Sequence, residues 1–128
     1  MVRPDRLTEI GYWRGLESSD DFPDPRDFVD TAWDPDEREV VGHYLNHGLA
    51  VVAYMGFSTC RICGRENGNL DLSDGQYIWP SGFAHYVEEH GVRPPQAFIG
   101  HVEQMLDELE TAPRDATWWK SLARKDPS

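Results

Sequence analysis

Two cysteines and two histidines within residues 60–90 constrain this chain more than any other feature of its sequence. Cys60 and Cys63 have the CxxC spacing, and His85 and His90 follow after 21 intervening residues. Two thiolates and two imidazoles are the usual ligand set of a closed, tetrahedral zinc site. We therefore expect these four residues to bind one structural Zn²⁺ ion, and we expect folding to depend on that ion.

The residues between the two ligand pairs have the pattern of a turn, a hairpin and a helix. Gly64 directly follows the second cysteine and permits the tight backbone turn of a zinc knuckle. Asp-Gly at 74–75 separates two short strands, at 69–73 and 76–79, and is a strong signal for a hairpin. A helix at 81–90 then carries both histidines. This order is that of a two-cysteine, two-histidine zinc finger.

Three departures separate this segment from a finger that reads DNA. A usual finger has about twelve residues between its ligand pairs, where this chain has 21. His85 and His90 would point about 140° apart on a regular helix, so we expect the last turn before Gly91 to be loosened. The helix sequence SGFAHYVEEH has two glutamates and no Lys or Arg. We therefore do not expect this module to bind nucleic acid.

The same segment resembles an uncharacterised group of small bacterial proteins. The resemblance is carried by CRICG, by SDGQYIWPSGFAHYVEEHGV and by the following PPQAF, and it covers roughly the middle third of the chain. The resemblance implies a coherent zinc-bearing module. We assign residues 49–91 to that module.

A CxxC thiol-disulfide oxidoreductase is the alternative reading of the cysteines. The stretch VVAYMGFSTCRIC looks like a strand that runs into a redox CxxC, where the first cysteine sits at a helix N-terminus. The next twelve residues, GRENGNLDLSDG, contain three glycines and two asparagines, which oppose a helix at that point. We therefore favour metal binding, and the redox protein stays as the alternative function.

Other metal-ligand sets are open on the sequence alone. His43 and His47 are four residues apart on a helix expected at 35–47, so they could bind a metal or replace one of the other histidines. Otherwise they are surface histidines near a helix C-terminus, where positive charge is favoured. A catalytic zinc would need an open position and a base such as Glu88 or Glu89. The chain has no HExxH, no GxSxG and no glycine-rich phosphate loop, so we assign no catalytic residue.

The remaining pattern predicts one α+β domain over residues 1–128 with a small antiparallel sheet. Its expected strands are 49–57, which reads as a buried strand, 69–73 and 76–79, and its expected helices are 35–47, 81–90, 95–111 and 115–124. Residues 1–33 are expected to form a loop-rich acidic arm packed on the core. We expect Trp118 and Trp119 to dock on the core, Tyr77 and Trp79 to form a dry shell by the metal, and His101 to lie in the core or at its rim.

The charge of the chain is strongly acidic and unevenly distributed. The net charge is −11, and residues 17–39 contribute ten acids and two arginines, a local charge of −8. Such a surface repels nucleic acid, and it either keeps the chain soluble or binds a basic protein partner. No apolar run of about 18 residues is present, and the N-terminus has no secretory signal pattern, so we expect a cytoplasmic protein with no membrane span. The expected function is that of a non-enzymatic zinc-binding adaptor or inhibitor-type protein.

Overall fold

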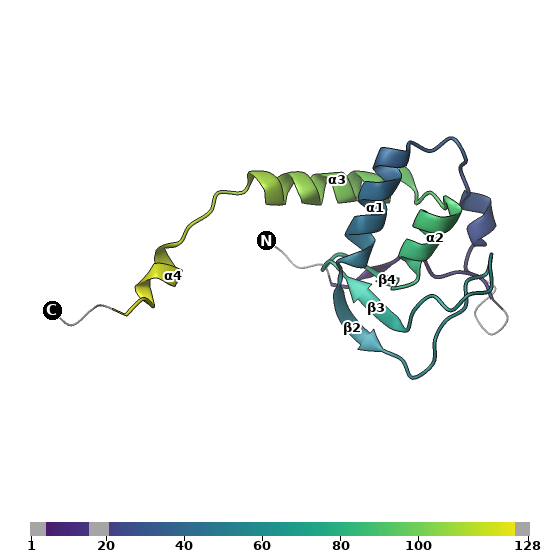
Figure 1. Ribbon diagram of the computed structural model, residues 1–128, viewed down its shortest axis with the longest axis horizontal. Coiled ribbons are helices and arrows are strands. Elements are labelled where there is room, and N and C mark those ends of the chain that lie inside the picture. The colour runs from purple at the N-terminus through teal and green to yellow at the C-terminus, as the bar shows by residue number, and fades with distance from the viewer. Residues whose placement is uncertain (1–4, 16–20, 125–128) are drawn as a thin grey trace.

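The computed structural model of the protein describes residues 5–15 and 21–124 and has mixed α and β structure (Figure 1). A four-stranded sheet lies beside three helices, and a fourth, short helix lies near the C-terminus. In chain order the elements are β1 (Thr8–Glu9), the 3-10 helix η1 (Pro25–Phe28), α1 (Pro35–Asn46), β2 (Leu49–Ala53), β3 (Leu70–Ser73), β4 (Tyr77–Pro80), α2 (Phe83–His90), α3 (Gln96–Thr111) and α4 (Thr117–Ser121). The expected α+β class is confirmed.

The sheet has the strand order β1-β4-β3-β2. Strands β2, β3 and β4 pair antiparallel as expected, whereas β1 pairs parallel with β4, so the sheet is mixed rather than purely antiparallel. Strand β1 comes from the N-terminal arm that was expected to be irregular. A two-residue strand is too short to show alternation in the sequence. It exists because Thr8 donates to the carbonyl of Gln76 and Ile10 to that of Ile78, both at 3.0 Å.

The hairpin of β3 and β4 is present, with its turn one residue later than the sequence suggested. Ser73 pairs with Ile78, and Asp74 N–H donates to the carbonyl of Tyr77 across the turn. Gly75 therefore occupies the first central position, with a φ of +96° that favours glycine. The hairpin has a turn end at residues 74–76 and an open end, where Pro80 leads into α2.

The core lies between the sheet and the helices α1, α2 and the first half of α3. The side chain of Asp34 caps α1 by accepting a hydrogen bond from Asp36 N–H at 3.1 Å, and Pro35 fills the first helical position. Trp79 is fully buried and donates its indole N–H to the carbonyl of Leu45 at 3.0 Å. The buried side chains of this core are Trp33, Val41, Leu45, Leu72, Trp79, Phe83, Ala84, Val87, Phe98, Ile99 and Val102.

The apolar run 49–57 does not form the buried strand that was expected. Strand β2 covers Leu49–Ala53 at one edge of the sheet, every residue in it is exposed, and Leu49 is 75% exposed. An apolar run predicts a strand, but it does not determine whether that strand is central or at the edge. Neighbours far away in the chain decide this, and here β3 pairs with only one side of β2.

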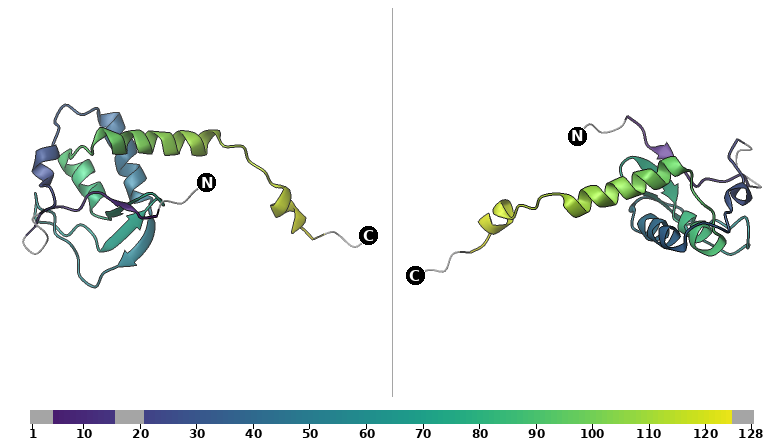
Figure 2. Two further views of the ribbon diagram at one scale, coloured as in Figure 1. Left: turned by 180° about the vertical axis from the view of Figure 1, so that it is seen from behind. Right: turned by 90° about the horizontal axis from the view of Figure 1, so that it is seen from above.

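The C-terminal part of the chain extends away from the rest of the molecule. Helix α3 packs on the core through its first half, its residues 107–111 are exposed, and α4 lies beyond its end in both further views (Figure 2). Trp118 and Trp119 are 71% and 69% exposed, so the expectation that they dock on the core is wrong. Pro113 stops α3 and favours extended backbone at Ala112, which directs the following residues away from the domain.

Candidate metal centre

The four residues singled out by the sequence converge at one point of the structure. The ligand atoms of Cys60, Cys63, His85 and His90 all lie within 4.8 Å of one another. Cys63 Sγ and His85 Nε2 are 3.3 Å apart. Cys60 is buried, the two histidines are half-buried, and Cys63 faces solvent. This group can hold a metal ion with two sulfur and two nitrogen ligands, which is a donor set typical of zinc.

A tight backbone turn places the two cysteines. Gly64 N–H donates to the carbonyl of Cys60 at 2.9 Å, and Cys60 N–H donates to the carbonyl of Arg65 at 2.8 Å. The amides of Ile62 and Cys63 point at Cys60 Sγ, with N–S distances of 3.4 and 3.5 Å. Gly64 has a φ of +77°, which a side chain would disfavour. These amides stabilise negative charge on the sulfur, which a thiolate ligand requires.

Helix α2 supplies the two histidines from its first turn and its last residue. Their ring centroids are 5.0 Å apart with an interplanar angle of 78°. At the helix end the carbonyl of Tyr86 accepts from the backbone N–H groups of Gly91 and Val92, which lie five and six residues further on. Gly91 is left-handed, with a φ of +64°. This wider last turn is the loosening that the spacing of the histidines predicted.

A small apolar cluster surrounds the buried side of the site. Cys60, Tyr86 and Val92 are buried there, and Trp13, Phe28 and Ile62 pack against them. The Tyr86 hydroxyl accepts from the backbone N–H of Arg61 at 2.7 Å, which fixes the cysteine turn against α2. Burial raises the pKa of Tyr86, and the neighbouring Cys60 adds to that rise.

Tyr77 and Trp79 do not form the expected dry shell beside the metal group. Trp79 belongs to the main core, and Tyr77 packs edge-on against Phe98 with ring centroids 4.9 Å apart. Both strand residues face the helices α1 and α3 instead of the cysteine turn. The N-terminal arm supplies part of the true shell, and its aromatic residues gave no signal in the sequence that they would lie by the metal ligands.

His90 provides a test of whether a metal fits this group. Its Nε2 is buried and has no hydrogen-bond partner within the described part of the chain. A buried polar atom without a partner costs about 1–3 kcal/mol, and a metal–nitrogen bond would remove that cost. Burial, followed by the neighbouring His85, lowers the pKa of His90 below its usual value. The neutral imidazole is the form that binds a metal, so the residue fits the group.

The alternative ligands lie elsewhere. His43 and His47 stack with ring centroids 4.2 Å apart, and both are exposed on α1. Neither belongs to the four-residue group, which is the set of this kind found within residues 5–15 and 21–124. Glu88 accepts from the Asn46 amide at 2.9 Å and so turns toward α1 rather than toward the cysteines. Its carboxylate is therefore not placed as a base at this site.

The two thiols also bear on the redox alternative. Cys60 and Cys63 are both free. The residues after Cys63 form no helix and lead instead to a bridge between Thr59 and Glu66, as the glycine-rich sequence indicated. The first cysteine therefore lacks the helix N-terminus that makes a redox CxxC nucleophilic.

A second convergence of side chains, which no sequence motif indicated, lies at the turn end of the hairpin. Asp74 accepts from the backbone amides of Gln76 and Tyr77 at 2.9 and 2.8 Å, from the Tyr44 hydroxyl at 2.6 Å and from His101 Nε2 at 2.6 Å. It therefore joins the hairpin to α1 and α3. The Asp-Gly pair indicated the turn, but nothing local indicated partners 30 and 27 residues away. His101 lies at the rim of the core, as expected.

Comparison of the chain with protein-family models, with curated proteins and with solved structures found no match. Across the described residues, no helix combines the length and the apolar character that crossing a bilayer requires.

Proposed function

We propose that this protein binds one structural zinc ion through Cys60, Cys63, His85 and His90, and that it acts in protein–protein interactions rather than as an enzyme. One observation carries the proposal. Two thiols and two imidazoles from separate segments lie with all ligand atoms within 4.8 Å of one another.

A structural role follows from the number of ligands. Four protein ligands complete a tetrahedral zinc site and leave no position for a water molecule or a substrate. The metal would join the cysteine turn to both ends of α2, which are otherwise linked through the Tyr86 hydroxyl and apolar contacts. Such a site contributes to folding rather than to chemistry.

Elemental analysis of protein purified without added zinc tests the metal assignment. We expect about one zinc per chain, and we expect His85→Ala and His90→Ala each to lower zinc content and melting temperature together. His47→Ala is the matched control, because His47 is exposed and lies outside the group. Full zinc retention in both ligand variants would contradict the assignment of the four zinc ligands.

The same measurement separates the alternative function. A thiol-disulfide oxidoreductase would be purified without metal and would form a reversible Cys60–Cys63 disulfide. A thiol count before and after oxidation, taken on the sample used for elemental analysis, distinguishes the two functions.

The proposed interaction surface is the acidic segment 17–39, of which residues 21–39 are described. Part of its charge is used internally, since Asp30 pairs with Arg93 at 3.0 Å. Asp27, Asp36 and Glu39 are exposed, and their carboxylates have no ion-pair partner among the described residues. They would bind a partner with Lys or Arg side chains.

A pull-down with the variant D27N/D36N/E39Q tests this surface. The control variant E103Q/D107N/E110Q removes the same charge from the exposed side of α3. We expect the first variant, and not the second, to lose a basic partner. Unchanged recovery of every partner with the first variant would reject this surface.

A further inference from the structure

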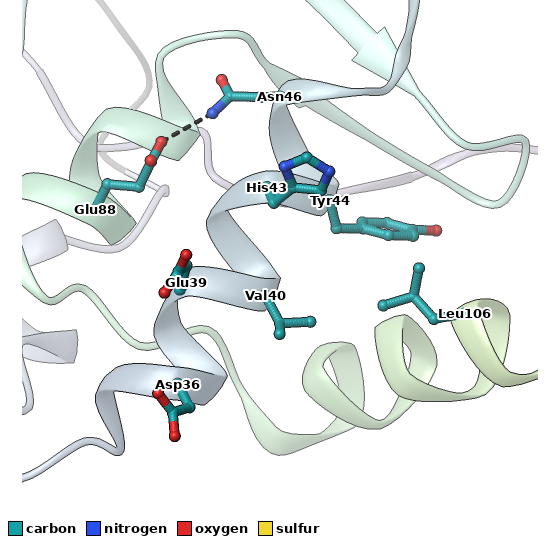
Figure 3. A pocket seen from close by; sticks show the side chains of 8 residues that line it. All are labelled: Asp36, Glu39, Val40, His43, Tyr44, Asn46, Glu88 and Leu106. Atoms are coloured by element: carbon teal, nitrogen blue, oxygen red, sulfur yellow. Dashed lines mark hydrogen bonds between the residues drawn. The ribbon is translucent and has the colours of Figure 1, made fainter.

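A groove along α1, which we call the α1–α3 groove, is flanked by Leu106 of α3 and by Glu88 of α2, and it combines an apolar wall with negative charge (Figure 3). It has a volume of about 630 Å³, and the carboxylates that line it are those of Asp36, Glu39 and Glu88. Val40 from α1 and Leu106 from α3 form its apolar sides, and both are exposed. Glu88 is held by Asn46, whereas Asp36 and Glu39 have no cationic partner in the described part of the chain. The groove therefore suits a ligand that is both apolar and positively charged.

The C-terminal segment 112–124, which we call the tail, has the complementary properties. It contains α4, whose Trp118 and Trp119 rings lie 6.1 Å apart and are largely exposed. Leu122 is exposed beside them. Arg114, Lys120 and Arg124 against Asp115 give the tail a charge of +2 (three cations and one acid), in a chain whose net charge is −11.

The tail needs a surface to pack on. An isolated helix of five residues is not stable in water, and two exposed tryptophans leave about 150–250 Å² of mostly apolar surface each in contact with solvent. The tail's own domain does not supply this surface in the structure, because residues 112–116 lead α4 away from α3 (Figure 1). Its residues 117–124 are exposed throughout.

We propose that the tail of one copy of this protein docks in the α1–α3 groove of a second copy. Reciprocal docking would give a closed two-fold dimer in which both grooves are filled. Four tryptophans would then bury about 600–1,000 Å² of tail surface. Together with a similar area of the partner's surface in and around each groove, the total would reach the roughly 1,200–2,000 Å² of a standard stable interface. The tail cations would lie against Asp36 and Glu39.

Formation of this dimer does not depend on the zinc site, and it is a property beyond the proposed function. The groove shares Asp36 and Glu39 with the acidic segment, so a docked tail would compete with a basic partner. The dimer itself requires no such partner. Zinc content is measured on every sample, so that a failure of the dimer and a failure of the metal assignment are told apart.

Light scattering coupled to gel filtration of the full chain gives the first test. Since one chain has a mass of 14.7 kDa, we expect about 29 kDa for the dimer at micromolar concentration. The variant W118A/W119A should elute as a monomer with unchanged zinc content. The control Val51→Lys alters the exposed edge strand β2 and should leave the dimer intact. A natural protein that is monomeric throughout would overturn the proposal, and so would a dimer lost in V51K but kept in W118A/W119A.

A charge exchange tests whether the tail docks in another copy. The groove variant D36K/E39K and the tail variant K120E/R124E should each be monomeric, with dimer affinity weakened at least tenfold. The groove variant has a positive groove and a positive tail, and the tail variant has a negative groove and a negative tail. In an equimolar mixture each tail can therefore dock in a groove of opposite charge, and a heterodimer should form. A mixture that stays monomeric would overturn docking between copies. So would a monomeric natural protein in which Trp118 and Trp119 are shielded from a fluorescence quencher, because each tail would then fold back on its own groove.

Discussion

The β3–β4 hairpin is tied to the rest of the molecule at both of its ends, by two different kinds of chemistry. At the open end, the cysteine turn and α2 bring together the four residues that could hold a metal ion. At the turn end, Asp74 joins the hairpin to Tyr44 on α1 and to His101 on α3. At the open end a buried His90 nitrogen has no protein partner among the described residues, whereas at the turn end Asp74 receives four hydrogen bonds from the protein itself. The metal tie would therefore depend on an added ion, and the Asp74 tie depends only on the folded chain.

Among changes at the two ends of the hairpin, removal of the metal should have the largest effect on the stability of the fold. Binding of a structural zinc contributes about 10–16 kcal/mol in finger peptides, which is as large as the whole stability of a typical domain of about 5–15 kcal/mol. We expect the chelated protein to lose its cooperative thermal transition in circular dichroism, and we expect re-added zinc to restore it. An unchanged melting temperature in protein that elemental analysis shows to be metal-free would contradict a structural role.

Asp74→Asn should destabilise the turn end while leaving the metal in place. The amide keeps the shape of the side chain but loses the charge that strengthens its hydrogen bonds to Tyr44 and His101. Hydrogen bonds to a charged group contribute about 1.5–3 kcal/mol, and we expect a loss of about 2–3 kcal/mol in urea unfolding of the zinc-loaded protein. Asp27→Asn is the control, since Asp27 is exposed. A loss of zinc from Asp74→Asn would show that the two ties are coupled rather than separate.

Tyr86→Phe tests how far the protein supports the metal end. The substitution removes the hydroxyl that accepts from Arg61 N–H and leaves that amide without its partner. We expect a destabilisation of about 1–2 kcal/mol and about tenfold weaker zinc binding in a chelator competition, because outer residues orient the ligands. Tyr77→Phe serves as the control, because that hydroxyl makes no hydrogen bond within the described part of the chain. Equal zinc affinity of the two variants would show that the ligands need no support from Tyr86.

The smallest expected effect is the pH dependence of the Asp74 tie. Burial alone would raise the pKa of Asp74, but the hydrogen bonds from Tyr44, Tyr77 and His101 outweigh burial and lower the pKa below its usual 3.8. A lowered pKa stabilises the fold above pH 3.8, and this contribution is lost as the pH falls through the folded-state pKa. The difference in unfolding free energy between the natural protein and Asp74→Asn should therefore shrink as the pH falls below 3.8 and through the folded-state pKa. A difference that grows as the pH falls below 3.8 would contradict the sign of this shift.

Features that depend on neighbouring residues could be predicted from the amino-acid sequence. The CxxC turn, the hairpin, the cap of α1, the loosened end of α2 and the extent of α3 each follow from residue types a few positions apart. The metal group could be predicted as well, although it joins segments 22 residues apart, because its four ligands form a recognisable chemical set.

Which distant surfaces meet became known only from the three-dimensional fold. It paired β1 with β4, left β2 at an exposed edge and carried α4 away from the core. It also brought Asp74 to His101 and placed Trp13 and Phe28 beside the metal ligands. The physical reason is common to all of these features. An apolar or acidic side chain has many suitable partners in this chain, and its pattern does not name one, whereas the two cysteines are the only thiols of the chain and a zinc site requires a small, defined set of further ligands.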